Sequence, residues 1–186
     1  MASLAVVTEL ILARHGETDW NLERRVQGHT DRPLNETGRA QARKLADALA
    51  DERVDAIYSS DLARAYETAL EVAARKRLAV HALPELRERS FGTWEGLTDE
   101  EVLDRFPEAR TGPWGDGETS EELSQRVLAA LRKIAVDHPD GSVLVVTHGG
   151  PLRAVLRHCE VVADAPIANC HIARFGFRAG ALRPID

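Results

Sequence analysis

Residues 10–21 of the chain read LILARHGETDWN. A short apolar run ends here in Arg14, His15 and Gly16, and charged and hydrogen-bonding side chains follow. Runs of continuous hydrophobicity are typical of strands that are covered on both faces. Because ligands of open α/β sheets bind beyond the carboxyl ends of the strands, this strand end is a candidate site. A single histidine in such a position is more often structural than catalytic. Whether His15 has a functional role therefore depends on the residues at the other strand ends.

Strand-like and helix-like segments alternate along the chain. Four further apolar runs of strand length follow the first, at residues 54–59, 78–83, 142–148 and 171–177. Residues 35–52 and 60–77 carry apolar side chains at helical spacing. This alternation predicts a three-layer α/β/α sandwich with a mostly parallel sheet, whose last strand runs antiparallel at one edge. A length of 186 residues predicts one domain over residues 1–186.

Helix starts are marked by capping residues. Asn35 is a predicted N-cap for the first long helix. Two capping boxes, Thr98 with Glu101 and Thr119 with Glu122, predict two later helix starts. The acidic residues near them therefore indicate helix first turns, which favour negative charge, rather than metal ligands.

The composition excludes several classes of partner. The formal net charge of −6 disfavours a nucleic-acid-binding protein, which needs an excess of Lys and Arg over one face. No apolar run is long enough to span a bilayer, and the first ten residues, MASLAVVTEL, lack the features of a signal peptide. We expect a cytoplasmic protein that binds neither nucleic acid nor membranes.

The two cysteines, Cys159 and Cys170, do not form a close pair of zinc-finger type, and we expect both to be buried thiols. The sequence shows neither a clustered Asp/His ligand set nor a nucleotide-cofactor fingerprint, which predicts no metal and no cofactor. The oligomeric state is not indicated.

Polar side chains follow several predicted strands and would meet at one rim of the sheet. They are Arg14, His15, Arg64, Glu85, Arg87, Glu88, Arg89 and His148. After His148, Gly149 and Gly150 precede a helix whose predicted first position is Pro151. Two arginines and the free N–H groups of a helix start match the oxygens of a phosphoryl group. A neutral histidine could attack phosphorus and form a phosphohistidine, while a carboxylic acid protonates the leaving alkoxide.

Five blocks of sequence, in order, resemble the histidine phosphatase superfamily, which includes cofactor-dependent phosphoglycerate mutases and small-molecule phosphatases. The blocks are ARHGETDWN (13–21), GHTDRPLNETGRAQA (28–42), IYSSDLARAYETA (57–69), LRERSFGTWEG (86–96) and VVTHGG (145–150). The similarity spans almost the whole chain. It implies a phosphoglycerate mutase-like fold.

The resemblance implies a role for each matched residue. His15 would be the phosphorylated nucleophile, and Glu88 would be the general acid and base, preferred over Glu85 and Glu95 by its distance from Leu86 and from the Phe91–Gly92 pair. Arg14, Arg64 and His148 would also be catalytic, because they would hold the phosphoryl oxygens during transfer. The implied substrate-binding residues are Arg14, Asn21, Gln27, Arg64, His148 and Gly149. Trp94, Glu95 and Gly96 match a block that we interpret as structural.

Phosphoglycerate mutases of this family are longer and carry a basic segment after the acid block. Here Arg105 and Arg110 are the only basic residues between Trp94 and the predicted helix start at Thr119, so that segment is missing. We therefore expect a metal-independent phosphomonoesterase that hydrolyses small organic phosphate esters and releases inorganic phosphate. The alternatives are a mutase with the same chemistry and a non-catalytic protein that binds phosphate esters.

Selectivity is expected from residues around the rim. They include His29, Thr30, Arg87, Arg89 and the Gly- and Pro-rich segment 106–117, which would be either a mobile cover or a plain connector. Trp20 and Trp114 would either stack on an organic group or pack internally. Sugar phosphates, phosphoglycolate-like acids and nucleotide-derived esters, including ribazole phosphate, all remain as candidate substrates.

Overall fold

The computed structural model describes residues 7–111, 114–162 and 166–185. The strands are β1 (Thr8–Arg14), β2 (Ala56–Ser59), β3 (Val80–Ala82), β4 (Ser142–Thr147), β5 (Ile172–Arg178) and β6 (Ala181–Pro184). The α-helices are α1 (Asp19–Leu22), α2 (Glu36–Ala48), α3 (Ala63–Lys76), α4 (Asp99–Arg105), α5 (Ser120–Asp137) and α6 (Gly149–His158). Short 3₁₀ helices cover Pro84–Leu86, Gly92–Trp94 and Pro107–Arg110. Among the described helices, none is both long enough and apolar enough to cross a membrane.

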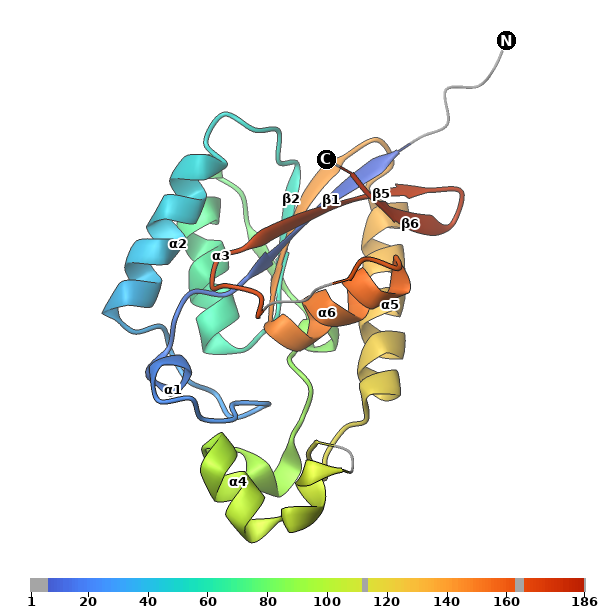
Figure 1. Cartoon of the computed structure of the whole chain (residues 1–186). Coiled ribbons are helices and arrows are strands. Elements are labelled where there is room, and N and C mark those ends of the chain that lie inside the picture. Colours follow the sequence, from blue (N-terminus) through green and yellow to red (C-terminus); the bar gives the residue numbers. More distant parts are fainter. Residues whose placement is uncertain (1–6, 112–113, 163–165, 186) are drawn as a thin grey trace.

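The sheet is covered on both faces, as the apolar runs predicted. Along β1, Leu10 and Leu12 join the core formed with α5 and α6. Ile11 and Ala13, which point to the opposite face, join the core formed with α2 and α3. Figure 1 shows the resulting α/β/α layers, with the sheet between the two pairs of helices.

The strand order is β3-β2-β4-β1-β5-β6. β1 to β4 run parallel, β5 runs antiparallel to β1, and β6 runs antiparallel to β5. The predicted antiparallel segment therefore forms a hairpin of two strands rather than one edge strand. Its turn residues, Ala179 and Gly180, have φ angles of 50° and 81°. Positive φ at both turn positions gives the type I′ geometry that suits a two-residue hairpin.

Most helix starts follow their predicted caps. The Asn35 side chain accepts a hydrogen bond from the Gly38 N–H, and Thr98 and Thr119 both form capping boxes. The start of α6 is a correction, because the helix begins at Gly149 and not at Pro151. Pro151 is accommodated there because the N–H groups of a first helical turn have no partner within the helix.

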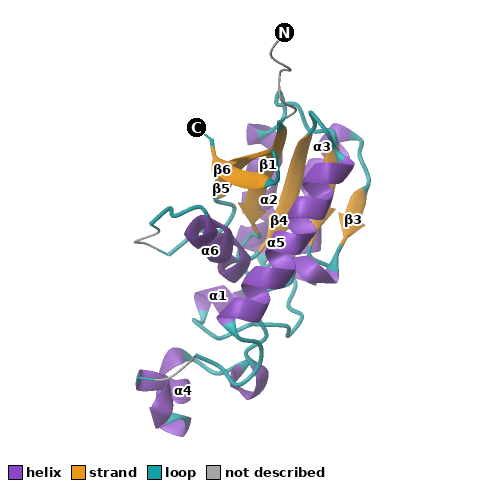
Figure 2. Ribbon diagram, turned by 90° about the vertical axis from the view of Figure 1, so that its right-hand side faces the viewer, coloured by secondary structure: helices purple, strands orange, loops and turns teal. Residues whose placement is uncertain are grey.

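A small lobe lies beyond the carboxyl ends of the strands. It holds α4 and a separate apolar cluster around Trp94 and Val102. The Trp94 ring stacks on Phe106 and meets Trp114 edge-on, with ring centroids 5.1 Å apart in each pair. Part of the segment 106–117 is thus packed, while residues 112–113 lie outside the described residues. Figures 1 and 2 both show α4 set apart from the sheet.

Candidate active site

The parallel pairing of β1 and β4 brings the two predicted histidines together. Arg14 is the register partner of Thr147, so His15 and His148 leave adjacent strands at the same level. Their ring centroids are 5.1 Å apart with an interplanar angle of 63°. Both side chains are buried, with exposed fractions of 3% and 0%.

The His15 ring is held in one tautomer. Its Nδ1 lies 2.6 Å from the Gly16 carbonyl oxygen, which can only accept, so Nδ1 carries the proton and Nε2 keeps its lone pair. Burial lowers the pKa of His15 well below its usual value, and the Arg64 and Arg14 guanidinium groups lower it further, against the smaller raising effect of the Gly16 hydrogen bond. At neutral pH this ring is an uncharged base with a free Nε2.

Arg64 fixes the second histidine in the opposite tautomer. Its Nε donates to His148 Nδ1 at 3.2 Å, so the His148 proton lies on Nε2. The other two nitrogens donate to the carbonyl oxygens of Gly28 and Thr30, at 2.8 and 3.1 Å. Burial lowers the pKa of Arg64 to about 10, which leaves it cationic at neutral pH. Burial, together with Arg64, likewise lowers the pKa of His148 well below its usual value.

Two buried donors in this group have no hydrogen-bond partner among the described residues. They are Arg14 Nε and His148 Nε2. Arg14 Nη1 is anchored on the Ile167 carbonyl oxygen. A Cβ built on Gly149 would lie 3.9 Å from Arg14 Nε, so the start of α6 adjoins this guanidinium. Since a buried donor without a partner is costly, the pair indicates a site built to hold an oxyanion.

Glu88 lines the same cavity as His15 and is held there by several contacts. One carboxylate oxygen accepts from the Arg89 N–H at 2.8 Å and the other from the Gly150 N–H at 3.0 Å. The Glu88 carbonyl oxygen accepts from His29 Nε2 at 2.9 Å and from Arg126 Nη2 at 2.8 Å. The loop after β3 is therefore tied to the start of α6 and to α5.

A cavity of about 430 Å³ joins most of the predicted site residues. The predicted residues in its wall are Arg14, His15, Asn21, Gln27, Arg64 and Glu88. His148 and Gly149 are not in the wall. His148 accepts a hydrogen bond from Arg64, which is in the wall, and a Cβ built on Gly149 would lie 3.9 Å from Arg14 Nε. Within the described residues, no group of three or more His, Cys, Asp or Glu side chains is arranged to hold a metal.

The family profile described as histidine phosphatase superfamily (branch 1) matches residues 10–183. The chain belongs to this superfamily. It is 42% identical over 178 residues to the metal-independent phosphoserine phosphatase of Arabidopsis thaliana, covering 89% of this chain and 75% of that one. It is also 42% identical over 159 residues to phosphoglycerate mutase-like protein 4 of the same plant, covering 79% and 69%. The structure of mycobacterial glucosyl-3-phosphoglycerate phosphatase complexed with VO3 matches it with a TM-score of 0.85 and 29% identity, over 95% of this chain and 96% of that one.

The predicted family and fold class are thus confirmed.

The three acidic residues that were weighed for the role of proton donor, Glu85, Glu88 and Glu95, lie in different surroundings in this histidine phosphatase. Glu95 accepts hydrogen bonds from the N–H groups of His29, Thr30 and Phe91 and from the Thr30 hydroxyl. Burial raises the pKa of Glu95, but these hydrogen bonds lower it more, so the net pKa is below its usual value. Glu95 holds the turn whose carbonyl groups bind Arg64. Glu85 lines a different cavity, on the α5 side.

Several rim residues of this histidine phosphatase are engaged in packing or ion pairs. Arg87 pairs with Asp61, with nitrogen–oxygen distances of 2.5 and 2.7 Å. The Arg32 guanidinium lies 5.2 Å from the centre of the Trp20 ring. Trp114 packs on Trp94 and also lines an outer cavity next to the active site.

Two residues that position the site, Thr68 and Asn169, could not be predicted from the sequence. Thr68 Oγ1 accepts from the Gly16 N–H at 3.0 Å and donates to the Arg64 carbonyl oxygen at 2.7 Å, which ties the loop after β1 to α3. Asn169 Nδ2 donates to the His15 carbonyl oxygen at 3.0 Å and lies 3.3 Å from Asn21 Oδ1. A lone Thr in a helix and a lone Asn in a loop give no sequence signal for such contacts.

Proposed function

We propose that this chain is a metal-independent phosphomonoesterase that hydrolyses small organic phosphate esters through a phosphohistidine at His15. The observation that carries the proposal is the arrangement around His15. An uncharged imidazole whose Nε2 keeps its lone pair adjoins two buried donors, Arg14 Nε and His148 Nε2, that have no partner among the described residues. A phosphoryl group would satisfy both donors and present phosphorus to the nucleophile.

The first step forms a nitrogen–phosphorus bond. His15 Nε2 attacks phosphorus, and the bond from phosphorus to the ester oxygen breaks as that oxygen leaves with its electron pair. Arg14, Arg64 and His148 offset the charge on the phosphoryl oxygens. The leaving alkoxide takes a proton from the Glu88 carboxyl group, which lies at the same cavity.

The second step regenerates the free enzyme. Glu88, now a carboxylate, takes a proton from an incoming water molecule whose oxygen attacks phosphorus. The nitrogen–phosphorus bond breaks, its electron pair returns to His15 Nε2, and inorganic phosphate leaves. Glu88 is protonated again, so the cycle is balanced.

The relatives support a small-molecule substrate. Both the phosphoserine phosphatase and the glucosyl-3-phosphoglycerate phosphatase named above act on small phosphate monoesters, and the chain covers most of each. We propose the same class of substrate for this chain. We also propose that residues 1–186 form one domain of this superfamily, which carries the site.

A chelator experiment tests the proposal. We expect release of inorganic phosphate from p-nitrophenyl phosphate to continue at an unchanged rate in the presence of EDTA. Loss of activity with the chelator, restored by a divalent cation, would contradict a metal-independent mechanism. Interconversion of 2- and 3-phosphoglycerate that depends on a bisphosphate primer would indicate a mutase, and binding of esters without turnover would indicate a non-catalytic protein.

A further inference from the structure

The cavity at His15 adjoins a larger one. The outer cavity has a volume of about 690 Å³ and shares Glu88, Phe91 and Arg153 with the cavity at His15. Much of its remaining wall comes from the segment between Trp114 and Leu123. The organic group of an ester whose phosphate lies at His15 would extend into this space.

The carboxylates of the outer cavity already have partners. Asp116 accepts from the Thr93 N–H at 2.8 Å and from its hydroxyl at 2.6 Å. Glu118 accepts from Arg126 at 2.5 and 2.7 Å. Glu88 accepts from two backbone N–H groups, at 2.8 and 3.0 Å. Among the described residues, none of these three carboxylates therefore pairs with the side chain of an arginine that lines the same cavity.

Three arginines line the outer cavity, and they differ in how they are held. Arg89 donates to Ser120 Oγ at 3.2 Å and to the Trp114 carbonyl oxygen, so it is part of the wall. Arg153 and Arg157 are exposed and make no hydrogen bond or ion pair with any residue in the described part of the chain. They are the two guanidinium groups available to a ligand.

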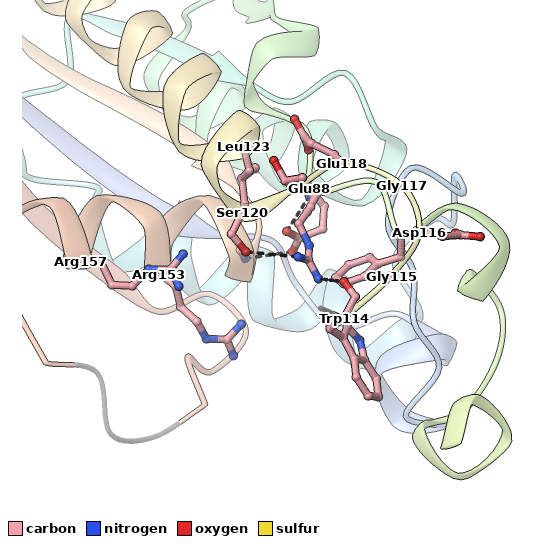
Figure 3. Close-up of a pocket in the computed structure, with 14 residues that line it drawn as sticks. Glu88, Trp114, Gly115, Asp116, Gly117, Glu118, Ser120, Leu123, Arg153 and Arg157 are labelled. Atoms are coloured by element: carbon pink, nitrogen blue, oxygen red, sulfur yellow. Dashed lines mark hydrogen bonds between the residues drawn. The ribbon is translucent and has the colours of Figure 1, made fainter. Parts of the chain in front are cut away.

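Arg153 and Arg157 stand one turn apart on α6. Residues four apart on a helix are neighbours on one face, and like charges at this spacing destabilise the helix. An anion between them would remove that repulsion and accept hydrogen bonds from both guanidinium groups. Figure 3 shows the two side chains projecting from α6 on the opposite side of the cavity from Trp114 and Asp116.

We infer that Arg153 and Arg157 form a second anion subsite, and that the substrate is a phosphomonoester whose organic group carries a second oxyanion. The inference rests on the proposed function, because the subsite is defined relative to a phosphate at His15. Arg153 lines both cavities and Arg157 only the outer one, so the second oxyanion lies on the α6 side of the outer cavity. The basic groups come from α6 rather than from the segment after the acid block.

Three esters with one carbon skeleton test the inference. Glycerol 3-phosphate has a neutral hydroxymethyl group at C1, 3-phosphoglycerate has a carboxylate there, and glycerol 1,3-bisphosphate has a second phosphate. We expect kcat/KM of the wild type to be at least about tenfold higher for one of the charged esters than for the neutral one, which corresponds to one charge-assisted contact. The better of the two identifies the oxyanion.

Substitutions of Arg153 and Arg157 then test whether these α6 residues cause the preference for a charged ester. In Arg157→Gln and Arg153→Gln, the ratio of kcat/KM for the preferred charged ester to that for glycerol 3-phosphate falls about tenfold. Arg132→Gln, which removes an exposed arginine from α5, is the matched control and keeps the wild-type ratio. Thermal denaturation checks that each variant is folded.

The outcomes separate the two proposals. Turnover of all three esters with no preference, or with a ratio that neither α6 substitution changes, would overturn the subsite alone. A loss shared equally by all three esters would assign the arginines to the reacting phosphate and overturn it as well. If the wild type hydrolyses neither these esters nor p-nitrophenyl phosphate, the proposed function fails and the subsite fails with it.

Discussion

The inner and outer cavities of this phosphatase are built from different parts of the fold. At the inner one, His15 and His148 follow adjacent parallel strands and are almost completely buried. At the outer one, Arg153 and Arg157 stand exposed on the surface of one helix. Groups locked at strand ends suit a reaction that every substrate shares, whereas groups on a helix surface suit a choice among substrates. Substitutions of His15 or of the groups that hold the phosphoryl group should therefore slow all esters alike, whereas substitution of the proton donor Glu88 should depend on the leaving group.

The largest expected effect is that of His15→Ala. Removing the nucleophile should lower kcat for every phosphate ester by about four orders of magnitude or more, as for nucleophiles of other covalent enzymes. Steady-state assays with p-nitrophenyl phosphate and an alkyl phosphate measure the loss. His158→Ala, which removes an exposed histidine from α6, is the control. Near-normal turnover by His15→Ala would refute the assignment of the nucleophile.

The loss of activity in Glu88→Gln should depend on the leaving group of the ester and not on how the ester is bound. An amide cannot protonate an alkoxide, so kcat for an alkyl phosphate should fall by about a hundredfold or more, and less for p-nitrophenyl phosphate, whose leaving group needs little help. The corresponding change at Glu85, which lies on the α5 side away from the inner cavity, should leave both rates unchanged. Equal losses for the two esters would point to a different proton donor.

Glu95→Gln tests whether the turn that holds Arg64 matters to the inner cavity. The amide cannot accept all of the hydrogen bonds from His29, Thr30 and Phe91, so we expect a stability loss of about 1–3 kcal/mol. Because Arg64 should lose its fixed orientation, kcat should fall about tenfold for all esters. Denaturant unfolding and steady-state kinetics give the two values. A variant that loses stability with unchanged kcat would show that Glu95 is only structural.

The smallest expected effect is a pH dependence of stability. The pKa values of His15 and His148 are lowered by burial, and the unfolded chain has ordinary histidines with a pKa of about 6.5. Below that pH the unfolded state binds protons that the folded state excludes, so the free energy of unfolding should fall by up to about 1.4 kcal/mol per pH unit for each buried histidine.

Urea unfolding between pH 7 and pH 5 measures this slope. His15→Asn should reduce it, whereas His158→Asn, which removes an exposed histidine, should not. A slope that is the same in the wild type and in His15→Asn would contradict a depressed pKa at this position.

The residues of the inner cavity could be predicted because strand ends are marked in the sequence. The run before Arg14 and the run before His148 are apolar enough to define buried strands, and parallel strands end at one edge. Helix starts with capping boxes were also predictable, because their contacts are local. The start of α6 was misplaced because Gly149 and Gly150 favour a turn in isolation and become helical only in this context.

Long-range contacts of single side chains could not be predicted. Arg126 on α5 reaches three backbone carbonyl groups of the loop that carries Glu88, and nothing in its neighbourhood in the sequence marks it. The tautomer of His148 depends on Arg64, which is 84 positions away along the chain. Arg89 and the segment 106–117 were expected at the rim, and Arg89 and Trp114–Gly117 line the outer cavity. The contribution of α6 to that cavity was not predicted, for the same reason.

The most direct test of the central claim is to look for the phosphorylated enzyme. The protein is mixed rapidly with a labelled phosphate ester, quenched in alkali, digested and examined by mass spectrometry. We predict a phosphoryl group on His15 Nε2 that survives alkali, is lost in acid, and forms and decays at rates compatible with turnover. Turnover without any phosphorylated enzyme, or a phosphoryl group on a different residue, would contradict the account.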